Sequence, residues 1–495
     1  MYVAEHEWSK PADGSDAKAG PDSNLARSTC EPRIAMLYRQ LAHGGPDAAT
    51  KAAAAAFLHQ QLADAASAAQ ALPQSPQDLL EWMRANAQAV AANYSVYLEQ
   101  RQAGAPRRFF SNRAHALYFL RSVAPTKLVD GAWLYGLLPH WRNSRFDDLV
   151  RTYVEELGEG VAGKNHVVLY RKLLARYGLD PLDDLSDQLH LQGLVQLALA
   201  CNAEEFLPEL IGFNLGYEQL PLHLLVTAYE LNELGVDPYY FTLHVTVDNA
   251  DTGHAQRACH AVLQTLPRIA DASDYWQRVR NGSRLAEAGV GTMEVIEGFD
   301  NQAEVIRIMS NKSSAGRGAH SDYCQVAGRK VNDWLSQPQQ IPAFLQALQQ
   351  AGWIKLGEPI ERSRFWNLLH GDRAEMFGVF SSYELQVIHD WIRGDASADG
   401  LAFTAAQALA GRPRRRASFR AEARLAAARG QAAPLAGEGD DTDLLDPDLQ
   451  ALSEQLPRLG DDQQMELLVR AMSPAQHWTP AGLYATRLFW ERVRS

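Results

Sequence analysis

Three consecutive apolar segments decide the fold: LHLQGLVQLALACN (residues 189–202), EEFLPELIGFNLGYEQL (204–220) and LHLLVTAYELNELG (222–235). In each segment the apolar residues recur at intervals of three and four, which is the spacing of one face of an α-helix. The segments are separated by Asn202, Pro221 and Gly235, residue types that commonly end helices. This stretch therefore predicts three neighbouring helices.

The same pattern continues outward, in RAHALYFLRSV (113–123), RFDDLVRTYVEELGEG (145–160) and NHVVLYRKLLARYG (165–178), while alternating β-branched runs are scarce. We therefore predict an all-α protein. Shifts in composition suggest a disordered tail (1–30), an N-terminal helical arm (31–104), a helical bundle (105–285), a compact C-terminal helical unit (286–397), a flexible linker (398–447) and a C-terminal helical cap (448–495).

Composition excludes several classes of function. The chain has 495 residues, and its net charge of −12 disfavours nucleic acid and anionic membranes as partners. Its four cysteines lie far apart with no CxxC pair, which fits a reducing cytoplasm rather than a disulfide framework. No signal peptide or membrane span is visible. We expect a cytoplasmic protein that binds a small-molecule substrate, and whose N-terminal arm could pack against a second copy to form a homodimer.

One segment combines core-like and polar character: YFTLHVTVDNADTGHA, residues 240–255. His244 and Asp248 are four residues apart, so on a helix they share a face, and Asp251 follows on the same side. Imidazoles and carboxylates on adjacent turns can hold iron or manganese inside a helical bundle. A capping aspartate, a core histidine and a surface aspartate would also explain the segment, and taken alone it slightly favours that interpretation while leaving both open.

Two other stretches add candidate ligands. Glu156 precedes a Gly-x-Gly sequence, and His166 opens the next apolar helix. Glu209 and Glu218 are nine residues apart, about 180° around a helix, so only one of them can face a given site. Glu218 lies in the more apolar surroundings, where a carboxylate has greater need of a partner. It is the better candidate ligand.

Taken together, EELGEG…NH…LY, GFNLGYE and FTLHVTVDN…GHA resemble the haem-oxygenase-like iron-containing redox enzymes, also called haem-oxygenase-like diiron oxidases and oxygenases. The resemblance implies a haem-oxygenase-like helical bundle over residues 105–285 that binds iron without haem. The implied ligands are a glutamate and a histidine around a first core helix, a glutamate on a second helix and a His-x3-Asp-x2-His pattern on a third. In this sequence these positions are Glu156, His166, Glu218, His244 and Asp248.

The last implied ligand departs from the pattern. Asp251 stands at the position where the final histidine is expected, and His254 follows three residues later. On a regular helix His254 would point about 120° away from Asp248, so the chain would have to unwind near Gly253 to bring it in. Both residues remain candidates, and His254 is favoured because iron sites use imidazole readily.

The resemblance implies a non-haem iron oxidase or oxygenase, with one or two iron ions as cofactor and O2 as co-substrate. It implies no catalytic residues beyond the metal ligands and no organic cofactor. We expect a small amine- or carboxylate-bearing substrate in natural-product biosynthesis, with N-oxygenation, oxidative decarboxylation or C–C cleavage as the reaction. Two other functions fit the same scaffold: a non-catalytic binding or partner protein, and a metal-independent oxidase.

Overall fold

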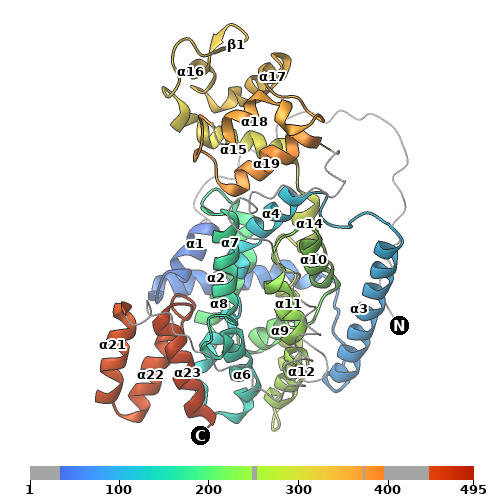
Figure 1. The fold of residues 1–495 in the computed structure, drawn as a ribbon. Helices are drawn as coiled ribbons and strands as arrows, with labels where there is room; N and C mark the ends of the chain where they lie inside the picture. Colours follow the sequence, from blue (N-terminus) through green and yellow to red (C-terminus); the bar gives the residue numbers. More distant parts are fainter. Residues whose placement is uncertain (1–33, 248–252, 372–373, 395–444, 495) are drawn as a thin grey trace, which may run out of the picture. The chain divides into compact units, whose positions relative to one another are not determined.

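The computed structural model describes residues 34–247, 253–371, 374–394 and 445–494. Within these ranges nearly all regular structure is helical (Figure 1), and the only strands are a two-residue antiparallel pair, β1 (Gln325–Val326) and β2 (Arg329–Lys330). The all-α fold class predicted from the sequence is confirmed. No helix in this part of the chain is both long enough and apolar enough to cross a membrane. The predicted tail, and the predicted linker except for its last three residues, lie outside the described residues.

The N-terminal helices pack against the central ones. They are α1 (Ile34–Ala42), α2 (Ala48–Asp64), the short 3₁₀ helices η1 (Ala65–Ser67) and η2 (Pro76–Asp78), and α3 (Leu79–Gln102). Both α1 and α2 contact α8 (Asp187–Cys201), while α3 contacts α10 (Leu222–Glu233) and α12 (His254–Thr265). The hydroxyl of Tyr38 donates to the carbonyl of Pro125 at 2.8 Å, which ties α1 to the central helices.

The central region contains the remaining helices of the predicted bundle. They are α4 (Arg113–Ser122), α5 (Ala124–Lys127), η3 (Ala132–His140), η4 (Ser144–Phe146), α6 (Asp147–Glu156), η5 (Gly158–Gly160), α7 (His166–Tyr177), α9 (Leu207–Tyr217), α11 (Tyr239–Val247) and α13 (Ser273–Leu285). The apolar pattern of 189–235 corresponds to α8, α9 and α10, whose buried residues include Leu194, Leu210 and Leu231. Helices α9 and α13 cross closely, because Gly212 and Gly282 leave no room for a Cβ between the two backbones.

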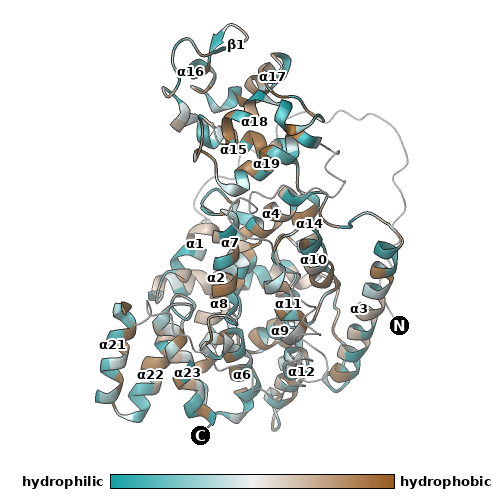
Figure 2. Cartoon of the chain, in the orientation of Figure 1, coloured by the Kyte–Doolittle hydropathy of each residue, from teal (hydrophilic) through white to brown (hydrophobic). Residues whose placement is uncertain are grey.

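The predicted C-terminal unit and cap are also helical. The unit comprises α14 (Thr292–Glu297), α15 (Asn301–Gly316), α16 (Val331–Trp334), η6 (Pro338–Gln340), α17 (Ile341–Gln350), η7 (Ile360–Arg362), α18 (Arg364–Leu369) and α19 (Ser382–Arg393). The cap comprises α21 (Pro447–Gln455), η11 (Leu456–Arg458), α22 (Asp461–Ala471) and α23 (Pro480–Arg494). Helices α22 and α23 carry hydrophilic and hydrophobic residues on different faces (Figure 2), and α23 packs against η5.

Candidate metal centre

The connection between α6 and α7, which includes η5, brings the first two predicted ligands together. Glu156 is the last residue of α6 and His166 the first of α7. Asn165 caps α7 by accepting a hydrogen bond from the amide of Val168 at 3.0 Å. Gly158 adopts a positive φ of 64°, and a Cβ there would collide with the backbone of Asn165. The chain can therefore reverse direction here, and the His166 imidazole contacts the Glu156 carboxylate.

Four buried side chains form a first group with metal-ligating atoms. They are Asp130, Glu156, His166 and His244, and one ligand atom from each lies within 4.8 Å of all the others. His244 Nε2 lies 3.2 Å from Asp130 Oδ2, and His166 Nδ1 lies 3.7 Å from the same oxygen. The rings of His166 and His244 are 4.4 Å apart at their centroids. Two imidazoles and two carboxylates at this spacing form a mixed nitrogen and oxygen donor set, which suits iron or manganese.

A second group adjoins the first and uses Glu156 again. It consists of Glu156, Glu218 and His254, all buried. His254 Nδ1 lies 3.1 Å from Glu156 Oε1 and 3.1 Å from Glu218 Oε2. Glu156 therefore presents one oxygen to His166 and the other to His254. The two candidate groups therefore share one carboxylate.

His254 reaches this position because the helix is interrupted before it. Helix α11 ends at Val247 and α12 begins at His254, with Gly253 in an extended conformation (φ −85°, ψ −167°). His254 is thus the first residue of a new helix rather than a late residue of the previous one. Asp248 and Asp251 lie outside the described residues.

The electrostatics of the first group favour ionised carboxylates. Burial alone would raise the pKa of Asp130, but Lys127, His166 and His244 hold it well below its usual value. Burial likewise opposes ionisation of Glu156, whose pKa His166 and His254 nevertheless hold below its usual value. Burial would lower the pKa of His166, but Glu156 and Asp130 raise it to about 10.

The fit to a cation is therefore good. Without metal, a proton on the His166 imidazole balances the carboxylates, and a divalent ion can replace that proton. One oxygen of Asp130, Oδ1, is buried with no hydrogen-bond partner among the described residues. A buried carboxylate oxygen normally has a partner, and a bound cation would supply one.

Outer residues fix the orientation of two imidazoles. His254 Nε2 lies 3.1 Å from Glu155, which also accepts from Arg151 Nε at 2.9 Å and contacts Arg257. Burial would raise the pKa of Glu155, but His254, Arg151 and Arg257 lower it to about 2. A carboxylate on the distal nitrogen of a ligating histidine sets its tautomer and orientation. Glu155 leaves Nδ1 of His254 facing Glu156 and Glu218.

His244 is oriented in a similar way. Its Nδ1 lies 2.8 Å from the carbonyl oxygen of Tyr240, so the other nitrogen, Nε2, faces Asp130. The Tyr240 hydroxyl donates to Asp130 as well. Gly131 (φ 81°) lets the chain pass close to the site, because a Cβ there would lie 2.9 Å from Glu156 Cβ.

The structure thus brings together five of the six predicted ligands, Glu156, His166, Glu218, His244 and His254, and does not describe the sixth, Asp248. Glu209, the alternative that the sequence disfavoured, instead forms an ion pair with Arg278 at 2.7 Å. The sequence reasoning missed Asp130. Its signal was present, because this carboxylate lies in the apolar stretch KLVDGAWLYGLL (127–138), but the following glycine is typical of an ordinary turn.

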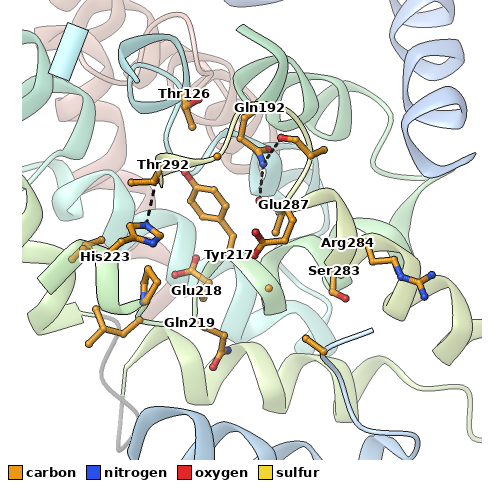
Figure 3. Close-up of a pocket in the computed structure, with 18 of the residues that line it drawn as sticks. Thr126, Gln192, Tyr217, Glu218, Gln219, His223, Ser283, Arg284, Glu287 and Thr292 are labelled. Atoms are coloured by element: carbon orange, nitrogen blue, oxygen red, sulfur yellow. Dashed lines mark hydrogen bonds between the residues drawn. The ribbon is translucent and has the colours of Figure 1, made fainter. Parts of the chain in front are cut away.

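A cavity of about 570 Å³ reaches both groups. Its lining includes Asp130, Glu156, Glu218 and His244. Figure 3 shows Tyr217, Glu218 and Gln219, at the end of α9, beside His223 and Thr292, which are joined by a contact of 3.4 Å. A small molecule in this cavity would contact the candidate metal ligands directly.

Comparison with known proteins agrees with this geometry. Residues 117–287 match the model of a protein family described as iron-containing redox enzymes. Neither the curated proteins nor the solved structures contain a match to the chain. The matched segment contains all the residues of both groups. The segment of the chain that builds this centre, residues 117–287, is therefore similar to the iron-containing redox enzymes.

Proposed function

We propose that the protein is a non-haem diiron oxidase or oxygenase that uses O2 to oxidise a small amine- or carboxylate-bearing molecule. The observation that carries this proposal is the position of Glu156, whose two carboxylate oxygens face separate groups of ligands. Two-metal sites hold their ions roughly 3.5–4 Å apart, a separation that one carboxylate can span. A single-ion site would not need two adjoining groups.

The described residues divide into two ligand sets. Asp130, His166 and His244 would hold one ion, Glu218 and His254 the other, and Glu156 both. Iron bound there would supply the capacity to activate O2. The protein would supply charge balance through three carboxylates and a buried environment that limits access of water.

We infer that the substrate is small, because the cavity volume lies within the roughly 300–1,000 Å³ of sites for small molecules. Among the reactions that we predict, N-oxygenation of an amino acid is favoured over oxidative decarboxylation and C–C cleavage. A role in natural-product biosynthesis is part of the same proposal.

Iron stoichiometry tests the function. Full-length protein reconstituted with Fe(II) without oxygen should bind two ions per chain, which Mössbauer spectroscopy would resolve as a coupled pair after exposure to O2. Glu156→Ala should lose both ions, whereas His254→Ala should keep one. Glu204→Ala, at a side chain that is 91% exposed, is the matched control and should bind iron normally. Protein that binds no iron would instead be a binding protein, and turnover after complete chelation would indicate a metal-independent oxidase.

A further inference from the structure

A lysine faces the cavity beside the candidate metal centre. Lys127 is the last residue of α5, three residues before Asp130, and both line the cavity. Its Nζ donates to the hydroxyl of Tyr217 at 3.3 Å. The same nitrogen lies 5.4 Å from the centroid of the Tyr217 ring and 5.8 Å from that of Tyr240. Aromatic faces at such distances stabilise a cation.

The ammonium group of Lys127 has more hydrogen-bond donors than acceptors around it among the described residues. A lysine carries three N–H donors, and Tyr217 is its one hydrogen-bond acceptor among the described residues, where it also forms no ion pair. The nearest acidic residues are engaged elsewhere: Asp130 with His244 and Tyr240, and Glu156 with His166. Lys127 and Asp130 attract one another, but no direct ion pair joins them among the described residues, so the remaining donors of the ammonium group are open to an anionic ligand.

We propose that Lys127 binds the carboxylate of the substrate. The inference rests on the proposed function and narrows it to carboxylic acids, amino acids among them. A single ammonium suits a monoanion, whereas phosphate groups are usually bound by several donors. Apolar cavity residues, Trp82, Val90 and Leu222, would contact the organic part of the molecule.

This placement directs the rest of the substrate toward the metal ligands. Lys127 and Asp130 are neighbours on the cavity wall, and Glu156 and Glu218 line the same space. A molecule whose carboxylate pairs with Lys127 can therefore present an adjacent amine or carbon to the centre. Arg284 is the other strong cation of the lining, but its guanidinium points away from Tyr217 and Glu218 (Figure 3) and donates to Asn281 at 3.1 Å.

The test measures binding of phenylacetate and of its neutral isostere phenylacetamide to the full-length chain by NMR titration, with and without Fe(II) under argon. Phenylacetate should bind more tightly than phenylacetamide. Lys127→Met should weaken phenylacetate binding about 10- to 100-fold, the usual effect of losing a charge-assisted hydrogen bond, and leave phenylacetamide unchanged. Lys127→Arg, which keeps the charge, should retain most of the affinity.

Controls separate this site from a general charge effect. Lys172→Met removes an exposed lysine of α7 and should not change either affinity. Melting temperature and iron content of Lys127→Met show whether that variant is folded. The proposal is overturned if phenylacetate fails to bind, if the amide binds equally well, or if Arg284→Met rather than Lys127→Met lowers the affinity. Phenylacetate binding is also measured without metal. The role of Lys127 can therefore be judged even if the protein proves to bind no iron.

Discussion

Removing the negative charge of Glu155 should weaken one of the two ligand groups and leave its neighbour intact. Glu155 contacts His254 Nε2 at 3.1 Å but touches none of Asp130, His166 and His244. Loss of a residue that orients a ligating histidine typically costs 10- to 100-fold in metal affinity, or roughly 1.4–2.8 kcal/mol. We expect about tenfold for Glu155→Gln, whose amide oxygen can still accept a hydrogen bond, and a loss nearer 100-fold for Glu155→Ala.

The same substitution also affects folding stability, because Arg257 would lose its contact with the Glu155 carboxylate. Breaking a fully buried ion pair costs about 3–5 kcal/mol. The Glu155 side chain is 21% exposed, so water can solvate part of the released charge and the cost should fall below that range. Melting of the metal-free variant measures this contribution separately from metal affinity.

Calorimetric titration with Fe(II) under argon is the appropriate assay. Wild-type protein should show two binding steps, of which Glu155→Gln weakens only one. Asp147→Asn, at an exposed position on the same helix, is the matched control and should leave both steps unchanged. Equal weakening of both steps, or of neither, would refute the assignment of Glu155 to His254.

Four further predictions concern pH, the backbone and metal binding. Metal binding should release the proton of His166, so Fe(II) affinity should rise by about tenfold per pH unit between pH 7 and 9. Titrations at several pH values measure the affinity, and titrations in two different buffers measure the proton that is released. In metal-free protein the His166–Glu156 pair stabilises the fold fully below about pH 6.5 and progressively less as the pH rises through about 10, so urea denaturation should show declining stability over that range. Gly131→Ala should cost about 1–3 kcal/mol in thermal melts and reduce iron content, whereas Gly163→Ala, where a Cβ meets nothing, should not. Chelation should lower the melting temperature, since Fe(II) at 100 times its Kd stabilises the folded chain by about 2.7 kcal/mol, and identical melts with Fe(II) and chelator would contradict an ordered site.

Local patterns made the helices predictable. Apolar content and spacing located α8, α9 and α10, and the structure buries α8 and α9 on all sides, with every residue from Gly193 to Ala200 and from Pro208 to Leu215 buried. The same reasoning selected Glu218 over Glu209, since the apolar surroundings of Glu218 contain no cation nearby in the sequence. The structure shows the reason: Glu209 has its own partner in Arg278, from a helix distant in the sequence.

The remainder of the site depends on tertiary contacts that no local pattern shows. Asp130 follows a short helix and has no spaced partner in the sequence, and only packing brings it to His166 and His244. Glu155 was not among the sequence candidates, because its role depends on where His254 lies in the folded chain. In the structure the carboxylates of Glu155 and Glu156 approach opposite nitrogens of a single ring, that of His254, which lies between them.

Residues near the C-terminus also contact the surroundings of the site, so the segment from 117 to 287 does not define the site alone. The Tyr153 hydroxyl donates to the carbonyl of Met472 at 2.6 Å, and the Asn165 amide lies 3.2 Å from His477 Nδ1. Burial lowers the pKa of His477 to about 3, so its ring is neutral and Nδ1 can accept that hydrogen bond.

Trp490 contacts the turn itself, donating to Glu159 at 3.1 Å, and Glu159 has an unusual positive φ of 53°. A non-glycine residue in that conformation costs free energy and persists only where surrounding contacts require it. The turn that positions Glu156 and His166 is therefore held by residues beyond position 287. The region from Met472 to Trp490 therefore helps to keep the first two candidate ligands, Glu156 and His166, in contact.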